Sequence, residues 1–143
     1  MEKLSSKIIK ELKKISLDHL LPHERVNQKK VNKLVKDIEE NGLKYPIIVM
    51  KYRKNFIIVD GHHRVEAFKI LGKKKIDAIV INYFSKKLKV FNPMYHEIKK
   101  NTVIKAIKNP LPPKSTRHMI MLKNRLVHVS YLSKIITKLK IFK

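Results

Sequence analysis

The chain contains no cysteine, and this absence excludes a disulfide scaffold, a thiolate zinc site and a cysteine nucleophile. It is also typical of an intracellular protein, so we expect a cytoplasmic location. The longest apolar runs, such as residues 46–50, are far too short to span a bilayer. Residues 1–5 lack the apolar core of a signal peptide. The sequence therefore predicts no membrane-embedded segment.

Acidic residues are scarce. The 143 residues include 34 Lys and Arg but only 11 Asp and Glu, which gives a formal net charge of +23. So large a positive charge favours polyanionic partners, namely nucleic acid, nucleotide phosphates or an anionic membrane surface. Charge alone does not choose among them. Because 43% of the residues are hydrophobic, the chain can bury a core, and full disorder is not expected.

The spacing of apolar residues predicts one α+β domain over residues 1–143, with a small mixed or antiparallel sheet and flanking helices. Gly42 and Gly72 stand where two of the helices should end. The expected helices cover residues 1–14, 27–41, 62–71, 93–108 and 133–142. The expected strands cover residues 15–17, 46–50, 55–59, 75–83 and 88–91, with a hairpin at 118–131 that turns at Lys123-Asn124.

The most informative segment is Asp60-Gly61-His62-His63-Arg64, where a buried strand gives way at once to a helix. A helix N-terminus presents free N–H groups and a partial positive charge, so this junction can hold a phosphate. Gly61 allows close backbone approach, and Arg64 can make a bidentate contact with phosphate oxygens. Asp60 can hold Mg²⁺ together with those oxygens. The alternative is an ordinary strand–helix turn, with Asp60 as the helix cap and both histidines in solvent.

Two further clusters carry polar side chains. Glu24 precedes the strongest predicted helix, where it either interacts with the helix dipole or serves as a general base. Residues 112–118 place two cations, two hydroxyls and an imidazole after a proline-rich linker, which suits a clamp for a carboxylate or phosphate. A plain basic loop is the alternative there.

These residues resemble the ParB/sulfiredoxin-fold superfamily. Asp-Gly-His-His-Arg at residues 60–64 is the form seen in its archaeal free L-serine kinases (SerK). Pro-His-Glu at 22–24, Asn-Tyr-Phe-Ser at 82–85 and Pro-Lys-Ser-Thr-Arg-His at 113–118 match further motifs of that branch in the same order. The resemblance covers roughly residues 15–118 and leaves 119–143 as a C-terminal extension without an assigned role. Sulfiredoxin chemistry is excluded, because His62 stands where those proteins carry their cysteine.

The resemblance implies a kinase that transfers a phosphoryl group from ATP or ADP to the hydroxyl of free L-serine, giving O-phospho-L-serine for cysteine biosynthesis, with Mg²⁺ as cofactor. Glu24 would then be the catalytic base, and Asp60 a catalytic residue that holds Mg²⁺ or orients the nucleophile. The residues implied to bind nucleotide phosphates are Gly61, His62, His63, Arg64 and Lys114. Those implied to hold the amino acid are Ser115, Thr116, Arg117 and His118. The inserted segment of the better-known members is missing between residues 86 and 112, which leaves the donor and acceptor open.

Two other functions compete with the kinase. A ParB-like nucleotide- and DNA-binding module without kinase activity is favoured by the +23 charge. It is disfavoured because the Gly-Glu-Arg-Arg signature of ParB and a recognizable helix-turn-helix are both absent from the sequence. A nuclease would need a set of carboxylates for two metals, which the sequence does not show. Incidental, non-specific binding to nucleic acid is expected at low salt whatever the function.

Overall fold

The computed structural model describes residues 8–139, which form two β-sheets and four α-helices. The strands of the first sheet are β1 (Ile9–Ser16), β2 (Leu20–Leu21), β3 (Ile47–Tyr52), β4 (Asn55–Asp60) and β5 (Lys75–Ile81). Those of the second sheet are β6 (Leu88–Phe91), β7 (Glu97–Ile98), β8 (Arg117–Leu122) and β9 (Arg125–His128). The helices are α2 (Gln28–Asn41), α3 (His62–Ile70), α4 (Lys100–Lys105) and α5 (Tyr131–Lys138), with a short 3-10 turn, η1 (Leu17–His19). The predicted α+β class is confirmed.

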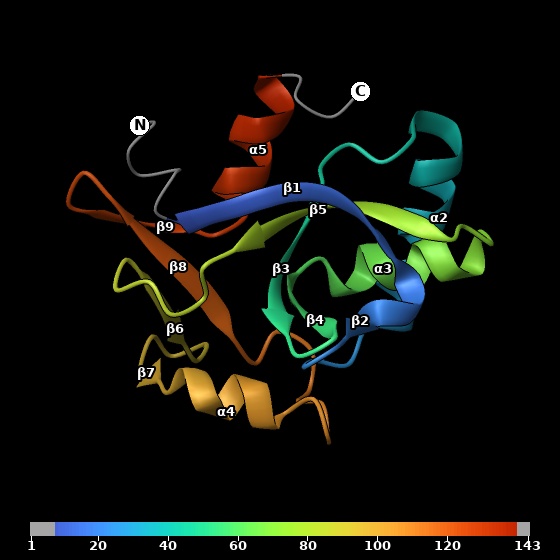
Figure 1. Ribbon diagram of the computed structural model, residues 1–143. Helices are drawn as coiled ribbons and strands as arrows, with labels where there is room; N and C mark the ends of the chain where they lie inside the picture. Colours follow the sequence, from blue (N-terminus) through green and yellow to red (C-terminus); the bar gives the residue numbers. More distant parts are fainter. Residues whose placement is uncertain (1–7, 140–143) are drawn as a thin grey trace.

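The five-stranded sheet is mixed, with the order β1-β5-β3-β4-β2. The β1–β5 and β3–β4 pairs are antiparallel, whereas β5–β3 and β4–β2 are parallel. The second sheet has the order β7-β6-β8-β9 and is antiparallel throughout. In Figure 1 the second sheet and α4 occupy the left and lower parts of the view, and α2 and α3 occupy the right.

Side chains of the central strands alternate between two hydrophobic cores, one on each face of the first sheet. Ile47 and Val49 of β3 point into a core closed by α2 and α3. Ile48 and Met50 point into the opposite core, which the second sheet and α5 close. Because β3 is covered on both faces, its sequence is a continuous apolar run, as expected for a central strand. Val129, Leu132 and Ile136 of the C-terminal extension are buried in this second core.

Helix α2 was predicted closely, because its sequence carries signals at both ends. The side chain of Asn27 accepts a hydrogen bond from the backbone N–H of Lys30 at 3.1 Å and caps the N-terminus. Gly42 follows the last turn with φ of 75°, and its N–H donates to the carbonyl of Ile38. Strands β3, β4 and β6 and the hairpin of β8 and β9 also confirm their predictions.

The N-terminal helix predicted over residues 1–14 is wrong for residues 9–14, because Ile9–Ser16 form strand β1. The open edge of β5 supplies a partner for seven residue pairs, and this pairing outweighs the helical spacing of Ile9 and Leu12. Residues 1–7, which include Leu4, lie outside the described residues.

The helix predicted over residues 93–108 is also wrong for most of its length. Only Lys100–Lys105 form a helix, α4. The side chain of Asn92 accepts hydrogen bonds from the backbone N–H groups of Met94 and His96, and Tyr95 has φ of 62°. This Asx turn competes with helix formation. The last helix begins at Tyr131 and ends at Lys138 rather than covering 133–142, and residues 140–142 of that prediction lie outside the described residues.

Candidate active site

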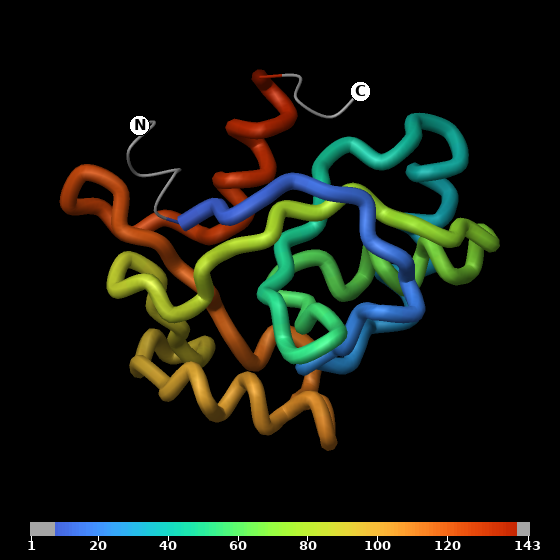
Figure 2. The backbone as a smooth tube through the Cα atoms, in the orientation of Figure 1, coloured from blue at the N-terminus to red at the C-terminus, as the bar shows by residue number. Residues whose placement is uncertain are grey.

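The three polar clusters of the sequence meet around one cavity of about 550 Å³. In Figure 2 the late segment between α4 and β8 lies beside the early segment that follows β2. Backbone hydrogen bonds join them, since Arg25 N–H donates to the Leu111 carbonyl and Leu111 N–H donates to the His23 carbonyl. The cavity is lined by Glu24, Lys30, Leu34, Val59, Asp60, Gly61, His62, His63, Arg64, Lys114, Thr116, Arg117, His118, His128 and Val129.

The strand–helix junction at the base of the cavity depends on Gly61. This residue has φ of 114°, and a Cβ atom on it would lie 2.5 Å from Cγ2 of Ile47. Gly61 itself is the N-cap of α3 and no side chain caps the helix, so the alternative in which Asp60 is the cap is wrong. The carboxylate of Asp60 instead accepts a hydrogen bond from Nη2 of Arg64 at 3.0 Å.

Arg64 is largely occupied by protein acceptors. Besides Asp60, its Nη1 donates to the carbonyl oxygens of Tyr45 at 2.8 Å and Pro46 at 2.9 Å. Three of its five N–H groups are therefore used, and at most two remain for a phosphate. The guanidinium thus fixes the entry to β3 and orients Asp60 toward the cavity.

Both histidines of α3 accept hydrogen bonds from the backbone that precedes α2. His62 Nε2 receives the N–H groups of His23 at 3.1 Å and Glu24 at 3.3 Å, and His63 Nε2 receives the N–H of Asn27 at 3.0 Å. Burial, followed by the charges of neighbouring histidines, holds the pKa of His62 well below 6.5. Both rings therefore present the Nε2 lone pair to the backbone, so each neutral imidazole carries its hydrogen on Nδ1.

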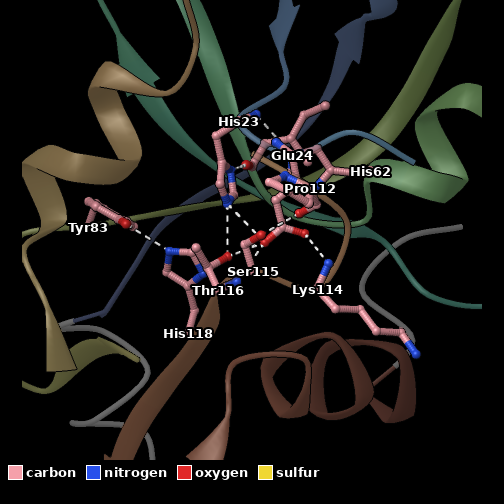
Figure 3. A network of polar contacts seen from close by, with 10 residues as sticks. His23, Glu24, His62, Tyr83, Pro112, Lys114, Ser115, Thr116 and His118 are labelled. Atoms are coloured by element: carbon pink, nitrogen blue, oxygen red, sulfur yellow. Dashed lines mark hydrogen bonds and ion pairs between the residues drawn. The ribbon is translucent and has the colours of Figure 1, made fainter. Parts of the chain in front are cut away.

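Glu24 links its own segment to the cluster at residues 112–118 (Figure 3). Its Oε1 accepts a hydrogen bond from Lys114 N–H at 3.1 Å, and its Oε2 accepts one from Thr116 N–H at 3.0 Å. The hydroxyl of Thr116 also contacts Oε2. The residue that caps α2 is Asn27. Glu24 therefore binds the backbone of the 112–116 loop and also lines the cavity.

Three cationic or titratable groups meet at the cavity mouth. The side chain of the nearby Lys114, followed by desolvation, lowers the pKa of Lys30. Burial and then the Lys30 charge lower the pKa of His63. Like charges that line the same cavity repel one another, and a bound anion relieves that repulsion. Sequence reasoning missed Lys30, which stands in the first turn of α2.

The remaining predicted substrate residues lie in different environments. Thr116, Arg117 and His118 line the cavity. The guanidinium of Arg117 lies 5.1 Å from the centroid of the Tyr95 ring. His118 is 2% exposed, and its Nε2 lies 2.7 Å from the hydroxyl of Tyr83. Ser115 is not among the cavity-lining residues, and its hydroxyl donates to the carbonyl of Pro112 at 2.6 Å.

Three buried histidines form a column in which the rings of His62 and His118, which line the cavity, flank the ring of His23. The ring centroid of His23 lies 4.6 Å from that of His62 and 5.5 Å from that of His118. Burial, then the charge of His23, hold the pKa of His118 well below 6.5. Burial raises the pKa of the neighbouring Tyr83 hydroxyl. The Pro-His-Glu motif was the only sequence signal for His23, and Tyr83 was visible only as part of a matched motif.

Lowering the pH below about 6.5 should destabilise the folded protein through this column. His62 and His118 stay neutral in the fold at pH values where histidines of the unfolded chain, near the ordinary pKa of 6.5, are protonated. The unfolded state then binds more protons, so the free energy of unfolding falls as the pH falls. Each residue contributes a slope of about 1.4 kcal/mol per pH unit over that range. Urea denaturation at several pH values measures the slope, and a constant free energy of unfolding from about pH 7.5 to 5.5 would contradict a neutral column.

Among residues 8–139, no group of three or more His, Asp and Glu side chains is placed to hold a metal ion. Asp60 and Glu24 are the carboxylates of the cavity wall. Of the two, Asp60 fits a Mg²⁺ ion, because Mg²⁺ is commonly held by one carboxylate together with phosphate oxygens and water, whereas both oxygens of Glu24 accept backbone N–H groups. Within the same described part of the chain, no helix is long and apolar enough to cross a membrane.

Comparison with known proteins identifies relatives of two kinds. The profile of the ParB N-terminal domain matches residues 2–94. An ATP-dependent L-serine kinase of Staphylothermus marinus is 36% identical over 102 residues, which cover 62% of this chain and 40% of that protein. An ADP-dependent L-serine kinase (SerK) of Thermococcus kodakarensis is 32% identical over 80 residues, covering 54% of this chain and 33% of that one.

The solved structure of a free serine kinase in complex with AMP matches this fold with a TM-score of 0.55 and 30% identity. The match covers 57% of this chain and 35% of that protein. The chain thus spans about a third to two fifths of the length of these relatives. The ParB profile includes Glu24 and residues 60–64 but ends before the 113–118 segment.

Proposed function

This chain belongs to the ParB N-terminal domain family, and we propose that it transfers a phosphoryl group from ATP or ADP to the hydroxyl of free L-serine, giving O-phospho-L-serine. The observation that carries the proposal is the meeting of three segments, far apart in sequence, around one cavity. The carboxylate of Glu24 binds the backbone of Lys114 and Thr116, and His62 accepts hydrogen bonds from the backbone of residues 23 and 24. The names of the serine kinases that resemble the chain support the same reaction.

Phosphoryl transfer requires alignment, charge neutralisation and a base for the attacking hydroxyl. In the proposal Glu24 removes the hydroxyl proton, because its carboxylate faces the cavity. Lys30, Lys114 and the N-terminus of α3 at Gly61 neutralise the phosphates. Arg64 contributes its remaining N–H groups and keeps Asp60 in place. His62 and His63 accept hydrogen bonds from the backbone of residues 23–27. In the proposal they keep this segment in position and so contribute indirectly to phosphate binding.

Mg²⁺ would supply charge neutralisation on the transferring phosphates. Asp60 is the residue that would hold it, because one of its oxygens accepts from Arg64 and the other has no protein hydrogen-bond donor within the described residues. The amino acid would be held by Thr116, Arg117 and His118 at the opposite wall. Arg117 offers a cation for the carboxylate of serine. Ser115, whose hydroxyl is engaged with Pro112, supports the loop that carries these residues.

Phosphorus NMR tests the proposal directly. The protein is incubated with Mg²⁺, either ATP or ADP, and a panel of serine, threonine and homoserine. We expect a phosphoserine signal with serine and one of the two nucleotides. A protein that binds nucleotide but forms no phosphorylated amino acid with either donor would contradict the kinase.

The alternative, a ParB-like nucleotide- and DNA-binding module, is favoured by the +23 charge. Binding of DNA through Lys and Arg releases counterions and should fall by about 10³–10⁵ between 50 and 200 mM salt if it rests on several phosphate contacts. Phosphorylation in a partly enclosed cavity is screened less by the same salt. A sequence-defined DNA footprint at physiological salt, together with no phosphoserine, would favour the module over the kinase.

A further inference from the structure

His23 is a fully buried histidine whose two ring nitrogens have fixed partners. Its Nδ1 lies 2.7 Å from the carbonyl oxygen of Ile58, and a carbonyl can only accept, so Nδ1 carries a hydrogen. The other nitrogen, Nε2, lies 3.1 Å from the hydroxyl oxygen of Thr116. Whether Nε2 is protonated therefore depends on whether the threonine hydroxyl donates a hydrogen bond to it or accepts one from it.

The hydroxyl of Thr116 lies between two groups that can each bind a proton. It contacts Nε2 of His23 on one side and Oε2 of Glu24 on the other. Two hydrogen bonds at this oxygen need two hydrogens, whereas threonine supplies one. The second hydrogen must come from a protonated His23 or from a protonated Glu24. With neither protonated, one of the two contacts has no hydrogen.

We propose that Glu24, Thr116 and His23 form a proton relay in which His23 takes up the proton that Glu24 removes from the substrate. The relay deepens the proposed phosphotransfer and rests on it for the identity of the substrate. His23 does not touch the substrate and acts through Thr116 and Glu24. In one state Glu24 is protonated and donates to the threonine oxygen, which donates to His23. In the other state His23 is protonated and donates to the threonine oxygen, which donates to Glu24.

The step balances in atoms and charge. The serine O–H bond breaks as its oxygen attacks the terminal phosphorus of the nucleotide, and the bond from that phosphorus to the leaving nucleotide breaks with its electron pair. The hydroxyl proton bonds to the carboxylate of Glu24. The carboxyl then donates from Oε2 to the threonine oxygen, while the threonine proton moves to Nε2. The result is a carboxylate, a threonine hydroxyl and an imidazolium, and the reverse transfer returns the proton to the cavity after product release.

The surroundings of His23 suit a transient proton acceptor. Burial lowers its pKa, so the ring rests neutral, whereas the Glu24 charge and the Ile58 carbonyl favour the protonated form. The carboxylate oxygen Oε2 lies 3.7 Å from Nε2. The other titratable groups that face His23 are His62 and His118, whose pKa values are also lowered, so they stay neutral beside it.

The relay is tested with Thr116→Val, which keeps the backbone N–H that binds Glu24 but removes the hydroxyl, and with Thr116→Ser, which restores it. Replacing His23 itself is avoided because the ring is fully buried. The probe is NMR of protein labelled with ¹⁵N in histidine and ¹³C in the glutamate carboxyl, titrated without nucleotide. In the wild type and in Thr116→Ser, the His23 and Glu24 signals should report the same titration steps. In Thr116→Val only the direct charge interaction between Nε2 and Oε2, which lie 3.7 Å apart, remains, so the two signals should be coupled less strongly.

The kinetic readout is kcat against pH. We expect kcat to fall about 10-fold or more in Thr116→Val and to recover in Thr116→Ser, because a base that cannot pass on its proton is less effective. Unchanged coupling of the His23 and Glu24 signals in Thr116→Val would overturn the relay, even if the wild type forms phosphoserine. Coupling that weakens as expected in Thr116→Val, in a protein that forms no phosphoserine, would support the shared proton and overturn the proposed function alone.

Discussion

Replacing Glu24 with glutamine should lower the kcat of serine phosphorylation by about 100-fold or more, which is the usual loss for a missing general base. The amide cannot accept the hydroxyl proton. It also places an NH₂ group against either Lys114 N–H or the Thr116 donors, which both face carboxylate oxygens in the native site. Steady-state kinetics give kcat, and titration calorimetry with nucleotide gives the affinity. Near-native turnover would restrict Glu24 to holding the loop.

The matched change is Glu24→Asp, which keeps a carboxylate but shortens its reach to the loop. We expect it to retain more turnover than the glutamine variant, because a base remains in the cavity. Equal loss in both variants, with weakened nucleotide binding in both, would show that the loop contact matters more than proton transfer.

Replacing Gly61 with alanine should destabilise the fold by roughly 2–5 kcal/mol, of which about 1–2 come from the left-handed backbone and about 1–3 from overpacking. The added methyl would lie 2.5 Å from Cγ2 and 2.9 Å from Cβ of Ile47, and 3.2 Å from Nη2 of Arg64. Ile47 is a fully buried residue of the central strand and cannot move freely. Urea denaturation measures the loss.

Gly72→Ala is the control for this prediction. Gly72 has φ of 72°, and nothing lies within 4 Å of the position of an added Cβ. It should therefore lose only the conformational part, about 1–2 kcal/mol. Equal destabilisation by the two substitutions would mean that the collision with Ile47 is relieved at no cost, and that Gly61 serves only its backbone angle.

The sequence predicted the elements that carry their own signals. Helix α2 has a cap at Asn27 and a glycine at its end, and the hairpin of β3 and β4 consists of apolar runs around a basic turn. Strand β1 was missed because its structure depends on the edge of β5, about seventy residues away in the chain, which local spacing does not reveal. The region after Phe91 was missed because one side chain, Asn92, holds a turn where apolar spacing suggested a helix.

The site was predicted as a set of segments rather than as an arrangement. Glu24, Asp60 and Thr116 were singled out by residue type and by resemblance, and they line the same cavity. Their hydrogen-bond partners were not predictable, because the contacts of Glu24 with Lys114 and Thr116 span about ninety residues. Lys30 carried no signal in a chain with 34 basic residues, and the engagement of Arg64 with Tyr45 and Pro46 required the fold.

The bridge between Glu24 and Leu111 has a consequence for the order in which the protein assembles. All five strands of the first sheet lie within residues 9–81, so that sheet can form while the rest of the chain is still being synthesised. The cavity cannot, because its far wall begins at Lys114 and closing so long a loop costs entropy that only the finished contacts repay. A ligand that contacts both walls therefore binds only the fully folded protein. It does not stabilise a folding intermediate in which only the first sheet has formed.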